Sequence, residues 1–278
     1  MPIHEQGYRR YRGGKVGGRA WLVIMSAGIR TMLGDRKFVG LLAASWLQFL
    51  TRAVLFYIAA NFSQATFFAP SSQTFREFFD WQDIFVFIIT VTVGARLIAQ
   101  DRRVNALQIY LSKPLTRTEY IFGKLGILVT FLLFITWVPA MLLLAVQVAF
   151  AGNFEFLRAN LYLFPAITLY AAIEVALVST SILALSSLSS DSRFVGIMFT
   201  GLVFFSKALY GVLRLVTAST HVSWVSFGNN LTQLADVIFR VPLHYQTPWF
   251  VSLFVVLALI GLAAFILERR VRGVEIVA

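Results

Sequence analysis

The chain has 278 residues, of which 58% are hydrophobic and 13% are charged, and its mean hydropathy is +0.76. This charged fraction is roughly half the ~25% of an average soluble domain, which excludes an ordinary soluble enzyme. The net charge of +11 is typical of proteins that bind nucleic acid or anionic lipid, and of membrane proteins with basic cytoplasmic loops.

The first apolar stretch, residues 20–33, is too short to cross a bilayer. Its apolar residues recur at the spacing of one helical stripe: Trp21, Ile24, Met25, Gly28, Ile29, Met32 and Leu33. This pattern predicts an interfacial helix on the cytoplasmic leaflet, either a plain anchor or a lever that moves with the first span. Arg30 interrupts the stretch and no cleavage site follows, so we expect a retained segment rather than a signal peptide.

Six later stretches are long and apolar enough to span a membrane. They cover about 38–60, 83–100, 120–149, 161–188, 194–217 and 248–267. Because lipid offers no partners to open backbone groups, we expect helices, with a kink at Pro139 in the third. The sequence therefore predicts an all-α integral membrane protein with a single transmembrane domain over residues 1–278.

Most of the basic residues fall on one side of these spans. That side carries Arg9, Arg10, Arg12, Lys15, Arg19, Arg30, Arg36, Lys37, Arg102, Arg103, Lys113, Arg117, Lys124, Arg193, Arg269, Arg270 and Arg272. The positive-inside rule then predicts that both termini are cytoplasmic in a multi-pass protein of the plasma (inner) membrane. A nucleic-acid-binding protein would gather its charge in one domain or stripe, so we expect the lipid bilayer as a partner and no nucleic acid.

The segment between the second and third spans carries the most informative pattern. Val104, Leu107 and Leu111 share one helical face, with Tyr110 beside them, and Pro114 ends that helix. The run from Thr116 to Glu119 forms a capping box, which predicts the start of the third span. The segment begins at Asp101, and Arg102, Arg103 and Lys113 surround its apolar face. Such a surface could bind either a groove on a soluble partner or the lipid surface.

The same segment resembles a known family. The matching residues are Arg96 to Arg103, Leu107, Tyr110 to Arg117, Tyr120, Gly123 and Lys124, and they resemble the signature loop of the type-2 ATP-binding-cassette exporter permeases. This resemblance implies a coupling helix within residues 101–115 that docks on a separate ATPase subunit. It also implies a permease dimer, formed with an identical or a different second permease copy, in which spans two and five line the cargo pathway. Members commonly carry an acidic residue at the position of Gln100 and a Gly-Thr pair at the positions of Asn105 and Ala106, and at these positions this chain has neither.

The chemistry of an enzyme is missing from the sequence. The chain has no cysteine, no Gly-x4-Gly-Lys-Ser/Thr nucleotide-binding pattern and no Gly-x-Ser-x-Gly elbow, and its histidines His4, His221 and His244 are isolated. We therefore expect no catalytic, cofactor or metal residues here, and if ATP drives the protein, ATP and Mg²⁺ bind to the partner ATPase.

Two further features lie within or between the spans. Glu174 and Lys207 fall near the middle of their spans, where a charge is costly unless it is paired or hydrated. They could form an interhelical ion pair, or Lys207 and Arg52 could line a wet conduit for an anionic substrate. In the loop 218–247, residues 231–239 are spaced as a short amphipathic helix that caps the bundle exit.

Three functions remain open at this stage. The first is a permease subunit of an ATP-binding-cassette exporter, and the second is a membrane anchor or scaffold that recruits a cytosolic partner through the same loop. The third is a proton-coupled secondary transporter that uses Glu174 as its proton carrier. Many cargo classes share the expected architecture, so the sequence does not identify the substrate.

Overall fold

Helices are the only regular elements in the part of the chain that the computed structural model describes, which covers residues 20–62, 70–105, 116–151, 156, 158 and 160–271. Six helical segments there are long and apolar enough to cross a membrane. They are Arg36–Asn61, Ser72–Arg103, Arg117–Phe150, Leu163–Leu188, Ser192–Thr217 and Trp249–Arg270. The predicted all-helical fold with six spans is therefore confirmed, and the chain is a multi-pass membrane protein.

Three of the six spans are interrupted, and three are single helices. The first consists of α2 (Arg36–Ser45) and α3 (Leu47–Asn61), and the third of α8 (Arg117–Ile135) and α9 (Trp137–Ala151). The second contains α4 (Ser72–Ile89), the π-helix η2 (Thr90–Gly94), α5 (Ala95–Leu97) and α6 (Ala99–Arg103). The continuous spans are α11 (Leu163–Leu188), α12 (Ser192–Thr217) and α14 (Trp249–Arg270). Outside the spans lie α1 (Ala20–Leu33), the 3₁₀ helix η3 (His221–Val225) and α13 (Phe227–Ile238).

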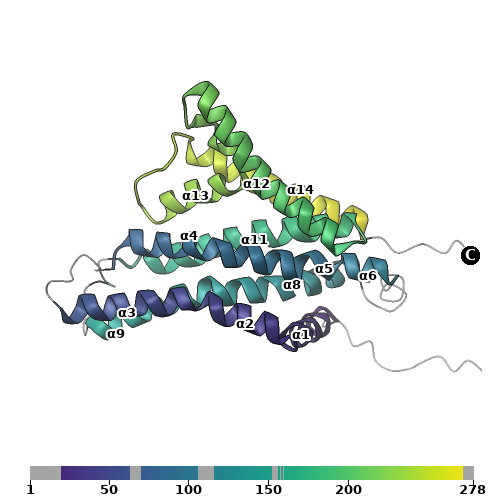
Figure 1. Cartoon of the computed structure of the whole chain (residues 1–278), viewed down its shortest axis with the longest axis horizontal. Helices are drawn as coiled ribbons and strands as arrows, with labels where there is room; N and C mark the ends of the chain where they lie inside the picture. The colour runs from purple at the N-terminus through teal and green to yellow at the C-terminus, as the bar shows by residue number, and fades with distance from the viewer. Residues whose placement is uncertain are drawn as a thin grey trace, which may run out of the picture.

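The helices lie in three layers, of which the lower two run along the long axis of the molecule, whereas α12 in the upper layer rises obliquely to it (Figure 1). In this view α2, α3, α8 and α9 form the lower layer, α4, α5, α6 and α11 the middle, and α12, α13 and α14 the upper. Helix α11 is the most enclosed span, with 72% of its most apolar window buried, against 22% for the spans α2–α3, α12 and α14. The less buried spans turn apolar side chains outward, as helices that face lipid do.

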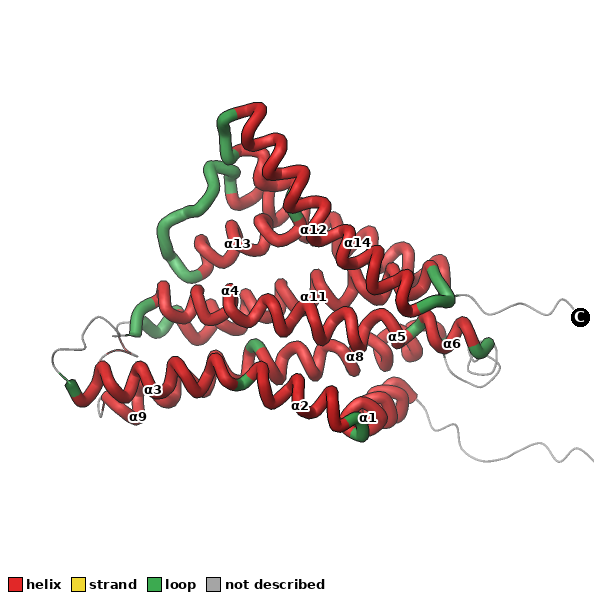
Figure 2. The backbone as a smooth tube through the Cα atoms, viewed as in Figure 1, coloured by secondary structure: helices red, strands yellow, loops and turns green. Residues whose placement is uncertain are grey.

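The first described helix and the end of the last one lie at the same end of the bundle. Figure 2 shows α1, α6 and the loop between α11 and α12 at the right, where α14 also ends. The residues Arg102, Arg103, Arg193, Arg269 and Arg270 belong to these segments. We call this end of the molecule the basic end.

The second span begins earlier than the sequence indicated. A start at residue 83 was expected, but α4 begins at Ser72, after Ser71, whose side chain forms a capping box with Thr74. The polar residues of the first three turns lower the local hydropathy, which is why the sequence pattern predicts a loop there. In the folded chain Arg76 and Gln82 are buried and bonded to protein groups, so the helix continues through this region.

The predicted kink at Pro139 is confirmed as a break between α8 and α9. Proline has no N–H, so the carbonyl of Ile135, four residues earlier, loses its helical partner. The Nε2 of Gln82 donates to this carbonyl at 2.6 Å and to the carbonyl of Ser45 at 3.2 Å, where α2 ends. One buried amide on α4 therefore donates hydrogen bonds to backbone carbonyls at the breaks of two other spans.

The irregular C-terminal part of the second span is supported by α11. A Cβ on Gly94 would lie 2.7 Å from Cγ2 of Ile182, so only glycine allows this approach between η2 and α11. Ser186 Oγ accepts hydrogen bonds from the N–H groups of Ile98 (3.2 Å) and Ala99 (2.9 Å) and donates to the carbonyl of Ala95 (3.0 Å). The backbone groups freed by the break between α5 and α6 are thus satisfied within the protein.

Helix α1 has the predicted bounds of residues 20–33, and its apolar stripe packs against protein. Ile24, Met25, Ile29 and Met32 contact the main hydrophobic core. A Cβ on Gly123 of α8 would lie 2.8 Å from Cβ of Ile24 and 3.1 Å from the carbonyl of Trp21. The two helices are therefore in close contact along this stripe.

Replacing Gly123 with valine should separate α1 from α8. The added side chain overlaps backbone as well as side-chain atoms, and such overpacking typically costs about 1–3 kcal/mol. The chain has no cysteine, so maleimide labelling of an Ile29→Cys variant should report the separation as faster modification when Gly123→Val is added. Gly261→Val is the matched control, because nothing lies within 4 Å of a Cβ at that position. Equal labelling rates with Gly123→Val and Gly261→Val would contradict the prediction.

Candidate functional site

At the basic end, two helices are tied together where the predicted coupling segment leaves the bundle. Asp101 Oδ2 on α6 lies 2.7 Å from Nζ of Lys124 and accepts a hydrogen bond from the hydroxyl of Tyr120 at 2.7 Å, both on α8. The capping box of Thr116 and Glu119 starts α8, as the sequence predicted. The two ends of the segment are therefore fixed to each other.

The same end of the second span is also tied to α11. The guanidinium of Arg102 donates to the carbonyl of Ser187. Arg103 is exposed, and α6 ends there. Val104 is 63% exposed, and Asn105 adopts a left-handed φ of 54°, so the chain turns directly after the helix.

The predicted coupling residues thus fall into two groups. Asp101, Arg102 and Arg103 belong to the end of the second span, and Val104 lies in the turn that follows. The remaining residues lie outside the described part of the chain; they are Leu107, Tyr110, Leu111, Lys113 and Pro114. A coupling helix within residues 106–115 stays a prediction.

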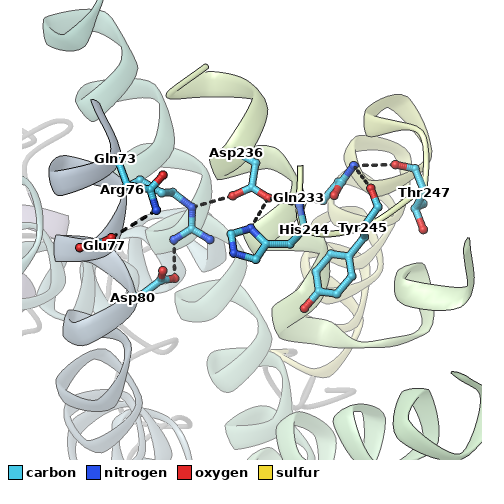
Figure 3. Close-up of polar contacts among 9 residues, drawn as sticks. All are labelled: Gln73, Arg76, Glu77, Asp80, Gln233, Asp236, His244, Tyr245 and Thr247. Carbon is cyan, nitrogen blue, oxygen red and sulfur yellow. Dashed lines mark hydrogen bonds and ion pairs between the residues drawn. The ribbon is translucent and has the colours of Figure 1, made fainter. Parts of the chain in front are cut away.

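At the opposite end, a buried arginine joins α4 to α13 (Figure 3). Arg76 is 1% exposed; its Nε lies 3.0 Å from Oδ1 of Asp236, and its guanidinium also bonds to Asp80 one turn along α4. Asp236 is fully buried, and its Oδ2 accepts the backbone N–H of His244 at 3.0 Å and contacts Nδ1 of that histidine at 2.8 Å. This cluster holds the loop after α13 against the second span.

The rest of that loop is held from α13 as well. Gln233 Nε2 donates to the carbonyls of Thr247 at 2.6 Å and Tyr245 at 3.3 Å. Burial, together with Tyr210 and Asp236, raises the pKa of the Tyr245 phenol, which keeps it uncharged. The amphipathic helix expected at residues 231–239 is confirmed in α13, which packs against α11, α12 and α14.

Sequence reasoning missed the Arg76 cluster. A second span that begins only at residue 83 leaves Arg76 in the loop before it. The available signals were the Ser71–Thr74 capping pattern and the four-residue spacing of Arg76 and Asp80, which together indicate that the helix starts earlier.

The intramembrane charges are arranged differently from the prediction. The ion pair of Glu174 with Lys207 is wrong, because Lys207 is exposed on α12 and no ion pair joins it to Glu174. Glu174 is 1% exposed and faces Asp83 of α4. Hydropathy gives the depth of a residue along its span but not the side of the helix on which it lies.

Arg52 has a local partner instead of a shared conduit with Lys207. It is buried on α3, its Nη2 lies 3.5 Å from Oε2 of Glu77, and it lines a cavity of about 510 Å³ between α3 and α4. Figure 1 places α3 and α12 on opposite sides of α4 and α11. Arg52 and Lys207 therefore do not line one cavity within a single chain.

Within the described ranges, no three histidine, aspartate or glutamate side chains are placed to hold one metal ion. No protein-family model and no curated protein matches this chain. The resemblance to type-2 exporter permeases therefore depends on residues 96–124 and on the order of the helices around them.

Proposed function

We propose that this chain is the membrane-spanning permease subunit of an ATP-binding-cassette transporter of the exporter type. A separate ATPase subunit, which binds ATP and Mg²⁺, docks on residues 101–115. The observation that carries this proposal is the anchoring of that segment, whose ends are joined through Asp101, Lys124 and Tyr120. A docking loop can pass force to the membrane domain only if its ends are held in this way.

The contacts at the basic end define which spans would move together. Asp101 transmits a displacement of the segment to α8, and Arg102 transmits it to α11 through the Ser187 carbonyl. Because α1 packs along α8, it would move with the same unit, which favours the lever role over the plain anchor. ATP-driven closure of the ATPase would then rock the second, third and fourth spans as one body.

The proposed function also implies an orientation of the chain in the membrane and an assembly with a second permease copy. The basic end would face the cytoplasm of a plasma (inner) membrane protein, with α1 as an interfacial helix on that side. A second permease copy, identical or different, would complete the transporter, with spans two and five at the cargo pathway. The lipid bilayer surrounds the outward-turned apolar faces of α2–α3, α12 and α14.

The docking assignment predicts that Leu107→Asp and Leu111→Asp each abolish association with the ATPase. Each substitution removes an apolar contact from the docking face and places there a carboxylate that would lose its water in the interface. The measurement is affinity co-purification of a co-expressed ATPase with the tagged full chain. Leu243→Asp is the control, since Leu243 is exposed in the loop after α13, at the opposite end from the basic end. Association like that of the wild type in both variants would overturn the docking assignment.

Transport measurements separate this function from the other two. Reconstituted vesicles that contain the ATPase should show ATP-dependent flux, whereas a scaffold recruits the ATPase without any flux. A secondary transporter would show flux without ATP that is driven by a proton gradient and lost in Glu174→Gln.

A further inference from the structure

Two carboxyl groups meet between the second and fourth spans. Asp83 on α4 and Glu174 on α11 line the same small cavity, where their side chains interact. Glu174 lies roughly midway along α11 and is 1% exposed, whereas Asp83 is exposed at the surface of α4. The pair therefore joins a buried side chain to one at the surface of the helix bundle.

The surroundings of the pair are apolar. Both residues line a cavity of about 100 Å³ that is bounded by α4, α11, α12 and α13, with Phe87, Phe199 and Phe227 among its walls. Oε2 of Glu174 has no hydrogen-bond partner among the described residues. A buried carboxylate with no donor costs several kcal/mol, so an ionised Glu174 is not satisfied by what the protein supplies.

The nearby charges do not supply the missing partner. Arg76 and Asp80 on α4, Tyr170 on α11 and Lys207 on α12 are the titratable groups that act on the pair. Arg76 is already engaged by Asp80 and Asp236, and no ion pair joins Lys207 to Asp83 or Glu174 within the described ranges. In the part of the chain that the structure describes, these neighbouring charges therefore form no ion pair with the two carboxyl groups, which interact with each other.

The chemistry of two facing carboxyl groups then decides what they bind. Two carboxylates have no hydrogen to donate and repel each other, so their contact is a hydrogen bond only when one of them carries a proton. The pair takes that proton from hydronium in water, which leaves one carboxylic acid, one carboxylate and a net charge of −1. The carboxylic acid O–H then donates to the carboxylate oxygen of its neighbour.

We propose that Asp83 and Glu174 form a binding site for one proton, shared between the two side chains inside the membrane domain. Asp83 forms the end of this site at the surface of α4, and Glu174 forms the end in the cavity. The site is formed by side chains of α4 and α11 and is independent of whether an ATPase drives the protein.

Infrared difference spectroscopy on the purified full chain in lipid nanodiscs tests this site. The wild type should show a carboxylic acid C=O band at neutral pH that shifts in D₂O, and both Asp83→Asn and Glu174→Gln should lose it. In each variant the amide N–H₂ donates directly to the remaining carboxylate, so no shared proton is required. Glu77→Gln is the matched control, because Glu77 is exposed on the same helix and pairs with Arg52, and it should keep the band.

Size-exclusion profiles and thermal unfolding establish which variants fold, and either variant alone is sufficient for the comparison. A wild type without the band, or a band that persists in the folded variants, would overturn the proposal. A wild type that lacks the band and is stabilised by Na⁺ or K⁺, with no such stabilisation in Glu174→Gln, would show a bound metal cation in place of the proton and would also overturn it.

Discussion

Replacing Arg76 with methionine is expected to lower the free energy of unfolding by about 3–5 kcal/mol, the usual cost of breaking a buried ion pair by removing one partner. Methionine keeps most of the volume of the side chain but leaves Asp236 fully buried with only His244 to bond its carboxylate. The measurement is chemical unfolding in detergent, followed by tryptophan fluorescence and compared with the wild type.

Two further variants make the Arg76 experiment specific. Arg240→Met should cost only about 0.5–1 kcal/mol, because Arg240 is exposed and its guanidinium lies 4.3 Å from the ring centroid of Tyr162, a cation–π contact. Adding Asp236→Asn to Arg76→Met should recover part of the loss, since the amide carries no uncompensated charge. An Arg76→Met protein as stable as the wild type would contradict the role of this cluster.

Much of the fold could be predicted because it depends on composition and local pattern. Six apolar stretches are sufficient to place six spans. The start of α8 follows from Thr116 and Glu119, and the break between α8 and α9 follows from Pro139, because these effects are local to the helix. The amphipathic spacing in residues 20–33 and 231–239 likewise gave α1 and α13. These features can be predicted without knowing which elements pack against them.

The features that could not be predicted all depend on contacts between distant helices. The burial of Arg76 in the first turns of α4 depends on Asp236, which lies 160 residues later in the chain and supplies its partner. The partner of Glu174 was misassigned because the depth of Lys207 matched, whereas the direction of its side chain is set by how α12 packs. Polar residues in a membrane helix are interpretable only once the groups that satisfy them are known.

The interrupted spans show the same dependence at the level of the backbone. Each break leaves backbone carbonyl or N–H groups without helical partners, and lipid can supply none. Side chains from the middle layer satisfy them. Gln82 on α4 donates to carbonyls of the first and third spans, and Ser186 on α11 accepts from N–H groups of the second. Helices α4 and α11 therefore stabilise breaks that the other spans could not sustain alone.

Replacing Gln82 with leucine should consequently destabilise the protein strongly. The substitution removes the donor to the carbonyls of Ile135 and Ser45, at about 1–3 kcal/mol for each carbonyl left unsatisfied. Gln82→Glu should lose a similar amount, because it keeps the shape and lacks the N–H₂ group. Gln73→Leu on the exposed side of the same helix is the control and should change the melting temperature little.

A second substitution should rescue the first if the mechanism is correct. Pro139→Ala restores an N–H four residues after Ile135, so the helix itself can satisfy that carbonyl. The double variant Gln82→Leu with Pro139→Ala should therefore be more stable than Gln82→Leu alone, measured as a higher melting temperature in the same detergent. If the two substitutions are merely additive in a double-mutant cycle, Gln82 does not act through the break at Pro139, and its burial must serve some other contact.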